Sequence, residues 1–180
     1  KDLSLFEIGP TFFGKNPGEQ EIVIGGMKSG MFDRKSWSRG SRNFDVFDVK
    51  ADAIRTLREI GLGGDDVYIA DSSRDYYHPG RSGSINYRSE SGPTLAYFGE
   101  IHPAIISNLD LKERNVCGFE IFLKNVKEPN NKMRLSRKTF KVSRYQKSER
   151  DFAFVIDKNF SAGKLKDLIY RLDKDLIKTV

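Results

Sequence analysis

Two β-prone runs separated by a short turn constrain the fold of this chain more than any other feature. The first run covers residues 3–13, the second covers residues 21–26, and Lys15-Asn16-Pro17-Gly18 lies between them. Asn, Pro and Gly together favour a turn, so the two runs predict an antiparallel hairpin with a longish loop. Pro10 interrupts the first run. Because proline cannot donate to a sheet ladder, it indicates an edge strand, a bulge or a bend.

Further strands and two helices are predicted downstream. The strands fall at residues 67–70, 84–87, 94–99 and 116–126, each bounded by polar or glycine-containing turns. A helix is predicted over residues 47–60, where Phe47, Ala51, Ile54 and Leu57 recur at helical spacing. Gly61 stands where a left-handed residue commonly ends a helix, and Leu62 is expected to fold back on Leu57. Pro103 suits the first position of a second, short helix.

The last forty or so residues predict one strand and one helix. The strand covers Phe152–Ile156 and the helix covers residues 162–178, with Ser161 as its N-cap. The helix carries one apolar stripe, made of Leu165, Leu168, Ile169, Leu172 and Leu176. A strand–helix pair of this size cannot bury a full core, so we expect it to belong to a domain that continues past Val180. The abrupt starts and stops of the pattern predict a fragment of something larger.

Charge changes sharply along the chain. Residues 1–120 carry 15 Lys/Arg and 18 Asp/Glu, and residues 121–180 carry 16 Lys/Arg and 7 Asp/Glu. The first block therefore has a net charge of −3 and the second a net charge of +9. Such asymmetry is typical of a chain with one end that faces nucleic acid. A basic segment is also a common solubilising surface, and both interpretations stand.

Composition excludes several classes of protein. Cys117 is the only cysteine, so neither an internal disulfide nor a thiolate metal cluster is expected, which fits a cytoplasmic location. No apolar run approaches the roughly 20 residues of a membrane helix, and no signal peptide is visible.

The candidate catalytic motifs are weak. The run Gly25-Gly26-Met27-Lys28-Ser29-Gly30 resembles a phosphate-binding loop but lacks the required glycine spacing, so a turn at a strand end is predicted. His78 lies near Asp75 and Ser82, but these residues are too close in sequence for a triad assembled from separate elements, and a turn is predicted there. No zinc-ligand spacing exists. Trp37, in a polar loop, is predicted to be a lid over the core rather than a stacking platform.

The candidate RNA-binding residues lie around the C-terminal strand. Arg144, Lys147 and Arg150 are candidates for phosphate contacts, with a solvated linker as the alternative. Phe152 and Phe154 share one face of the predicted strand. They are candidates for stacking on bases, with packing against the apolar stripe of the helix as the simpler alternative.

Six segments resemble, in order, a known family. They are Leu5-Phe6-Glu7-Ile8-Gly9-Pro10, Phe44-Asp45-Val46-Phe47-Asp48-Val49-Lys50, His78-Pro79-Gly80-Arg81-Ser82, Gly99-Glu100-Ile101-His102-Pro103, Phe119-Glu120 and Glu149-Arg150-Asp151-Phe152-Ala153-Phe154-Val155-Ile156-Asp157. Each is weak alone, but together they resemble the β subunit of bacterial phenylalanyl-tRNA synthetase over nearly the whole chain.

The resemblance implies a fold and a layout. The fold class is α+β, with an antiparallel sheet and flanking helices like the class II synthetase catalytic module, followed by a partial ferredoxin-like β-α unit. Residues 1–127 would form the non-catalytic, synthetase-like module. Residues 128–150 would form a basic tether, and residues 151–180 would begin the anticodon-binding domain.

The resemblance also implies a function. The family enzyme joins phenylalanine to tRNA(Phe) with ATP and Mg²⁺ as an α2β2 assembly, and its chemistry lies on the α subunit. This fragment is therefore expected to hold no catalytic residue, metal or cofactor, and to pack on the α subunit and bind tRNA. The sequence has no glycine-rich G-x-G-x-E-R element; its Glu113-Arg114 and Glu149-Arg150 pairs lack the glycine run. The alternatives are a free-standing RNA-binding module and a hydrolase that uses His78.

Overall fold

The computed structural model describes residues 2–33, 36–38, 40–109, 111, 115–127, 142–158, 160–173 and 175–180. The chain divides into two compact units, residues 1–136 and residues 137–180. This boundary lies inside the predicted tether, of which residues 128–141 are outside the described part. The first unit contains β1 (Leu3–Phe12), β2 (Gln20–Ser29), β3 (Met31–Asp33), β4 (Arg42–Asn43), α1 (Val46–Glu59), the 3-10 helix η1 (Gly64–Asp66), β5 (Val67–Ala70), β6 (Tyr77–Tyr87), β7 (Thr94–Ile101), α2 (Pro103–Asn108), β8 (Val116–Phe122) and the 3-10 helix η2 (Leu123–Asn125).

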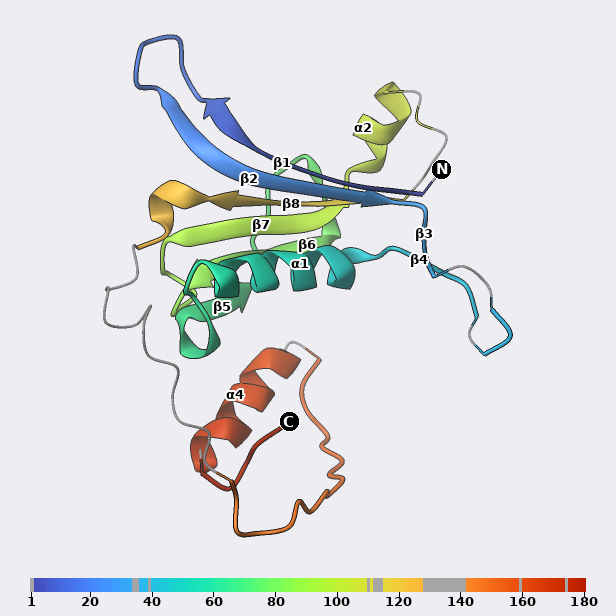
Figure 1. The fold of residues 1–180 in the computed structure, drawn as a ribbon, viewed down its shortest axis with the longest axis vertical. Coiled ribbons are helices and arrows are strands. Elements are labelled where there is room, and N and C mark those ends of the chain that lie inside the picture. Colours follow the sequence, from blue (N-terminus) through green and yellow to red (C-terminus); the bar gives the residue numbers. More distant parts are fainter. Residues whose placement is uncertain are drawn as a thin grey trace. The chain divides into compact units, whose positions relative to one another are not determined.

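One antiparallel sheet organises the first unit (Figure 1). Among the described residues it has six strands in the order β1-β2-β8-β7-β6-β5, and every neighbouring pair is antiparallel. Helix α1 runs along one face of this sheet, and β3 and β4 pair as a separate short ribbon. The predicted α+β class and N-terminal hairpin are confirmed, and Pro10 lies on the edge strand β1, as its missing donor requires.

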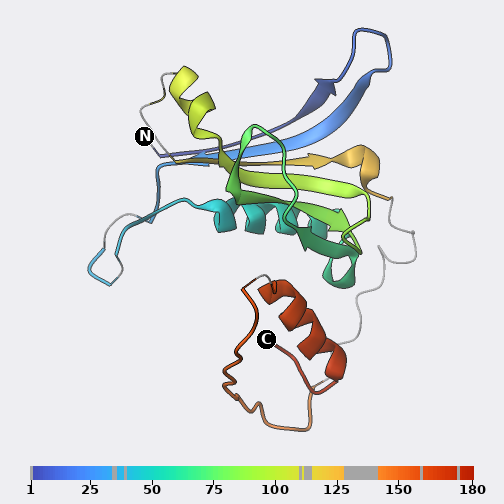
Figure 2. The ribbon, with the colours of Figure 1, turned by 180° about the vertical axis from the view of Figure 1, so that it is seen from behind.

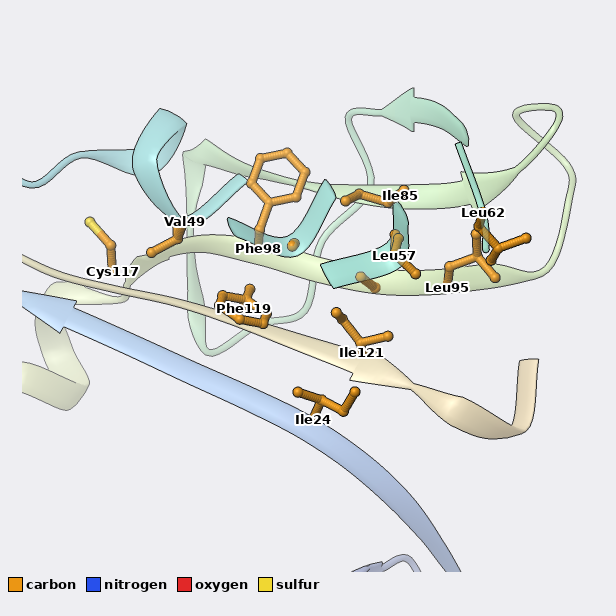
Figure 3. Packing of buried hydrophobic residues seen from close by; sticks show 12 residues of the cluster. Ile24, Val49, Leu57, Leu62, Ile85, Leu95, Phe98, Cys117, Phe119 and Ile121 are labelled. Atoms are coloured by element: carbon orange, nitrogen blue, oxygen red, sulfur yellow. The ribbon is translucent and has the colours of Figure 1, made fainter. Parts of the chain in front are cut away.

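The core lies between α1 and the inner strands, as Figure 3 shows. Ile24 of β2, Ile121 of β8 and Ile85 of β6 face α1, and Leu57 of α1 packs among them. Ile121, Ile85 and Leu57 are fully buried. The alternation of Phe119 and Ile121 toward α1 with Glu120 and Phe122 away from it is the alternation that the sequence predicts for a strand covered on one face.

Helix α1 ends as its sequence predicts, and its start has a cap that was not predicted. Asp45 caps its start: the Asp45 carboxylate accepts from the backbone N–H groups of Phe47 and Asp48, and the Asp48 carboxylate accepts from the Asp45 N–H. At the other end Gly61 has φ +99°, and the Leu62 N–H donates to the Leu57 carbonyl at 2.8 Å. These are the left-handed glycine and the back-folded bond of a Schellman ending, as expected.

The buried face of α1 differs from the predicted stripe. Val49, Ala53 and Leu57 are fully buried, whereas Phe47 is exposed. Within the predicted stripe, Leu57 is buried as expected and Ile54 packs against the core. Phe47 does not face the core, and the buried face runs instead through Val49 and Ala53. The small Ala53 side chain allows α1 to approach the strands closely, which a bulky residue there would prevent.

Three strand boundaries correct the sequence-based predictions. β2 continues through Gly25 and Gly26 to Ser29, and the turn comes at Gly30, whose φ is +87°. The two glycines stay in the ladder because β8 pairs with them, Gly25 with Glu120 and Gly26 with Phe119. β6 begins at Tyr77 and therefore includes the predicted turn at His78-Pro79-Gly80, which lies in a register shift of the β6–β7 pair. β8 ends at Phe122, where η2 begins.

The second unit contains α4 (Ala162–Leu172) and none of the predicted strand. Residues 152–156 are irregular, and no described segment of the second unit is paired as a strand. A strand needs a partner for its backbone N–H and C=O groups, and this unit supplies none among its described residues. The helix is shorter than predicted, its cap Ser161 makes no side-chain bond, and none of its residues is buried.

Candidate functional site

The predicted RNA-binding residues are all exposed. Phe152 and Phe154 have 75% and 54% of their surface exposed, and their rings stack with centroids 6.3 Å apart and an interplanar angle of 30°. Neither ring is buried in the second unit as the structure describes it, and packing against the apolar stripe of the helix stays a prediction. Two exposed aromatic rings with accessible faces can stack on bases, and whether they do so stays a prediction.

The three basic candidates differ in their contacts. Lys147 forms an ion pair with Glu149 at 2.6 Å, and both side chains are exposed. Arg150 donates to the backbone carbonyl of Glu149 at 3.2 Å. Arg144 is exposed. Exposed ion pairs of this kind contribute little to stability, so Lys147 can exchange Glu149 for a phosphate at low cost.

The residues of the hydrolase alternative do not form a nucleophile–base pair. The Ser82 hydroxyl donates to the backbone carbonyl of His78 at 2.6 Å, not to its imidazole. The imidazole Nδ1 accepts from the Gly80 N–H at 3.0 Å. The arrangement stabilises the irregular start of β6 and does not activate a hydroxyl. The second histidine, His102, caps α2 by accepting from the Ala104 N–H at 3.2 Å.

The glycine run in β2 does not form a phosphate loop. Its lysine, Lys28, lies on the α1 face of the sheet and pairs with Asp52 of α1 at 2.5 Å. A strand held between two neighbours also directs its N–H groups sideways into the ladder rather than toward an anion.

A polar cluster that the sequence did not reveal lies on the sheet face opposite α1. The segment between β5 and β6 crosses this face (Figure 2), and the Tyr76 hydroxyl donates to the carboxylate of Glu120 on β8. Arg74 stacks over the Tyr97 ring, 5.0 Å from its centroid. Sequence distance hid this cluster, because its members lie on the segment before β6, on β7 and on β8.

Burial raises the pKa values of several side chains on this face. It raises the pKa of Glu120, and it raises the pKa of Tyr76, with a further contribution from the bond to Glu120. The pKa of the buried Tyr77 is raised by the same cause. Both phenols are therefore protonated at neutral pH. On the other face, burial raises the pKa of Cys117 to about 12, so this thiol is not a nucleophile. The Tyr76–Glu120 bond and the Arg74–Tyr97 contact are both made within the chain.

The β1–β2 hairpin is rich in exposed apolar side chains. We use the term arm for residues 3–13 and 20–29. Its exposed apolar side chains lie on both faces: Phe6, Ile8, Phe12 and Ile22 on the α1 face, and Leu3, Leu5 and Met27 on the other. Phe6 has 79% of its surface exposed. A concave space of about 280 Å³ lies between the arm and α1, lined by Phe6, Lys28, Asp52 and Arg55 among others.

The described residues contain neither a metal-ligand group nor a membrane-spanning helix. No group of three or more His, Cys, Asp or Glu side chains in the described part could hold a metal ion. Among the described helices, none has the length and apolar character needed to cross a membrane.

The fold and these surfaces define a class: an α+β module built on an antiparallel sheet, with a helix over one face, the Tyr76–Glu120 bond among aromatic side chains on the other, and one edge left apolar. Comparison with known proteins agrees with this class. Residues 1–123 match the family model described as "Phenylalanyl tRNA synthetase beta chain CLM domain". The chain belongs to the family of phenylalanyl-tRNA synthetase β chains.

Curated relatives extend the similarity to the second unit. The chain is 36% identical over 180 residues to the phenylalanine–tRNA ligase β subunit of Paramagnetospirillum magneticum. This match covers 100% of this chain and 22% of that protein. It is 39% identical over 183 residues to the β subunit of Bartonella quintana, with 99% of this chain and 22% of the relative covered. The chain thus spans about a fifth of the length of the relatives it matches.

Proposed function

We propose that this chain serves phenylalanine–tRNA ligase as a non-catalytic module of its β subunit, which packs against the α subunit and binds tRNA(Phe) in the cytoplasm. The full enzyme would attach phenylalanine to the tRNA at the expense of ATP. The observation that carries the packing role is the arm, whose apolar side chains are exposed on both faces of one edge hairpin.

An exposed edge of this kind favours a partner. Monomeric proteins rarely leave a large contiguous apolar patch in water, and such patches mark interaction sites. The outer edge of β1 also has backbone groups without a strand partner among the described residues, which a partner strand or helix can cover. A partner that encloses the arm from both faces would bury Phe6 and Leu5 together.

The module is proposed to be non-catalytic because of how its described residues are arranged. The face opposite α1 is occupied by the Tyr76–Glu120 bond and by Arg74 stacked on Tyr97. The described residues do not fit a magnesium site, since they bring no three potential ligands together. The assignment of ATP and Mg²⁺ to the α subunit is part of this proposal and rests on the family resemblance. The exposed Arg144, Lys147, Arg150, Phe152 and Phe154 are proposed to contact tRNA.

Co-elution with a phenylalanine–tRNA ligase α subunit tests the packing role. The chain should co-elute with the α subunit on size exclusion, and Phe6→Ser should weaken this association at least tenfold, because a buried aromatic anchor commonly contributes about 2 kcal/mol or more. The matched control is Leu172→Ser on α4, an equally exposed apolar side chain outside the arm, which should leave co-elution unchanged. Equal binding by both variants would exclude the arm as the docking surface.

A further inference from the structure

Phe6 and Trp37 are two highly exposed aromatic side chains of the first unit, and they differ in what surrounds them. Trp37 has 99% of its surface exposed, so the predicted lid over the core is wrong. Phe6 has 79% exposed, but it lines the concave space of about 280 Å³ between the arm and α1. We call this space the cleft. All the residues that line it belong to the described part of the chain.

The floor of the cleft is apolar. Phe6 on β1, Gly26 on β2 and Phe119 on β8 lie in one row across the α1 face of the sheet. Because Gly26 has no side chain, the Phe119 ring occupies the position that a Cβ would take there. The floor thus runs from the buried Phe119 to Phe6, and it is exposed at its Phe6 end.

The wall that α1 supplies to the cleft is polar and carries one charge that is not neutralised. Lys28 of β2 pairs with Asp52 of α1 at 2.5 Å, so these two charges cancel. The Thr56 hydroxyl donates to the Asp52 backbone carbonyl at 2.9 Å. Arg55 lines the same wall, is exposed, and has no carboxylate or hydrogen-bond partner among the described residues. Arg55 therefore leaves the cleft with a net charge of +1.

A partner that covers the cleft would remove water from Arg55. A guanidinium that loses water without gaining an anion is costly, so a partner that buries Phe6 here must also bring an anionic group. A single cation is too little for a nucleic-acid backbone, which is held by several phosphate contacts. A protein segment with an acidic side chain beside apolar ones fits both the floor and the wall.

The position of the cleft favours a helix as that segment. The cleft lies on the face of the sheet that α1 covers, beside α1 and over the arm (Figure 1). A strand added at the outer edge of β1 would lie in the plane of the sheet and would leave this face open. A second helix beside α1 would continue the helical layer over β1 and β2, which is a common way for a sheet to bury an apolar face.

We propose that the cleft receives an amphipathic helix of the α subunit, whose apolar side chains cover Phe6 and whose aspartate or glutamate pairs with Arg55. This inference rests on the proposed function, because it takes the α subunit as the partner, and it adds the element and the charge that this partner presents. A guanidinium and a carboxylate can form two parallel hydrogen bonds, so Arg55 would fix the position of the helix along the cleft. Phe6 would supply the apolar anchor beside it.

Charge reversal at Arg55 tests the proposal. In the full 180-residue chain, Arg55→Glu should raise the dissociation constant for the α subunit, measured by isothermal titration calorimetry, by about tenfold or more, because two carboxylates would then face each other in a covered site. Arg55→Lys keeps the charge without the fork of donors and should lose about two- to fivefold. The matched control is Arg58→Glu, the same charge change at an exposed residue of α1 that does not line the cleft. It should bind within about twofold of the parent chain.

The outcomes separate this inference from the proposed function. If the parent chain does not bind the α subunit, both fail. If the parent chain binds and Arg55→Glu binds as tightly as Arg58→Glu, this inference alone fails. It also fails if Arg55→Glu dissociates a dimer of the chain, which would place a second copy in the cleft, or if Arg55 is needed for binding a single-stranded RNA.

The folding of Arg55→Glu is checked separately, by urea unfolding followed by circular dichroism. Arg55 is exposed and makes no bond to the described residues. The urea midpoint of the variant should therefore stay close to that of the parent chain. A loss of binding with an unchanged midpoint supports the pairing of Arg55 with the partner, and a loss of binding that follows a loss of folding in Arg55→Glu and in Arg55→Lys alike would overturn it.

Discussion

Burial differs between the edge and the centre of the sheet, as three isoleucines in one row across it show. Ile8 of β1 pairs with Ile24 of β2, and Ile24 pairs with Ile121 of β8. They are the same residue on the same face, yet their exposed fractions are 60%, 9% and 0%. The difference comes from α1, which lies over the strands near β8 and leaves β1 uncovered.

This comparison teaches that an apolar strand sequence does not decide its own burial. β1 and β8 are both rich in apolar residues, but only β8 has a strand on each side and a helix above it. The centre of the sheet is therefore stabilised by its own contacts, whereas the edge keeps its apolar surface exposed. Four experiments can break or sharpen this contrast.

The largest expected effect comes from truncating the two ends of the isoleucine row. Ile121→Ala should lower the free energy of unfolding by about 2–5 kcal/mol, because it opens a cavity in a closed core. Ile8→Ala, the same change at the exposed edge, should cost about 0.5 kcal/mol or less. Urea unfolding followed by circular dichroism measures both. Similar losses for the two variants would mean that the edge is already covered within the chain.

The second contrast lies within β2, at two adjacent glycines. A Cβ at Gly26 would meet the Phe119 ring at 2.2 Å, whereas a Cβ at Gly25 meets nothing within 4 Å. Gly26→Ala should therefore lower the free energy of unfolding by about 1–3 kcal/mol through overpacking. Gly25→Ala, on the face away from α1, should be nearly neutral. If the two variants unfold at the same urea concentration, the closed contact between β2 and β8 is not as described.

A smaller effect is expected where α1, the cover of the core, begins. Asp45→Ala removes the cap that accepts from the Phe47 and Asp48 N–H groups, and should lower the thermal midpoint through a loss of about 1 kcal/mol. Asp45→Asn keeps an accepting oxygen and should retain most of the stability. A loss as large for asparagine as for alanine would point to charge rather than capping.

The smallest effect concerns acid stability at the same helix start. The Arg42 bond holds the pKa of Asp48 below its ordinary value. A depressed carboxyl pKa adds stability above the unfolded value of about 4, and this stability is lost as pH falls through the folded pKa. Arg42→Gln should therefore flatten the loss of stability between pH 6 and pH 3. Urea midpoints at the two pH values measure this slope, and equal slopes in both proteins would contradict it.

Much of the first unit could be predicted from local sequence. Asp45 and Gly61 mark the ends of α1 by chemistry that acts within one helical turn, and Pro10 marks an edge strand by its missing donor. The stripe that α1 buries could not be read in the same way. Phe47 and Val49 are both apolar, and the sheet, which is assembled from distant segments, selects one of them.

The candidate sites divide along the same line. The basic and aromatic residues from Arg144 to Phe154 were visible as a run in the sequence, and the structure shows them exposed. The Tyr76–Glu120 bond was invisible, because 44 residues separate its partners. The predicted strand at residues 152–156 failed for a related reason: its apolar run suits a strand, but a ladder needs a second strand, and the described part of this unit has none.

The sequence by itself determined where α1 ends, which family the chain resembles and how charge is distributed, because these depend on the residues themselves and their near neighbours. Strand limits such as the start of β6 depended on pairing with other strands. Only the tertiary structure decided which apolar side chains are buried. Ile8 and Ile121 are chemically identical, and only the place of β1 at the edge and of β8 beneath α1 leaves one exposed and makes the other part of the core.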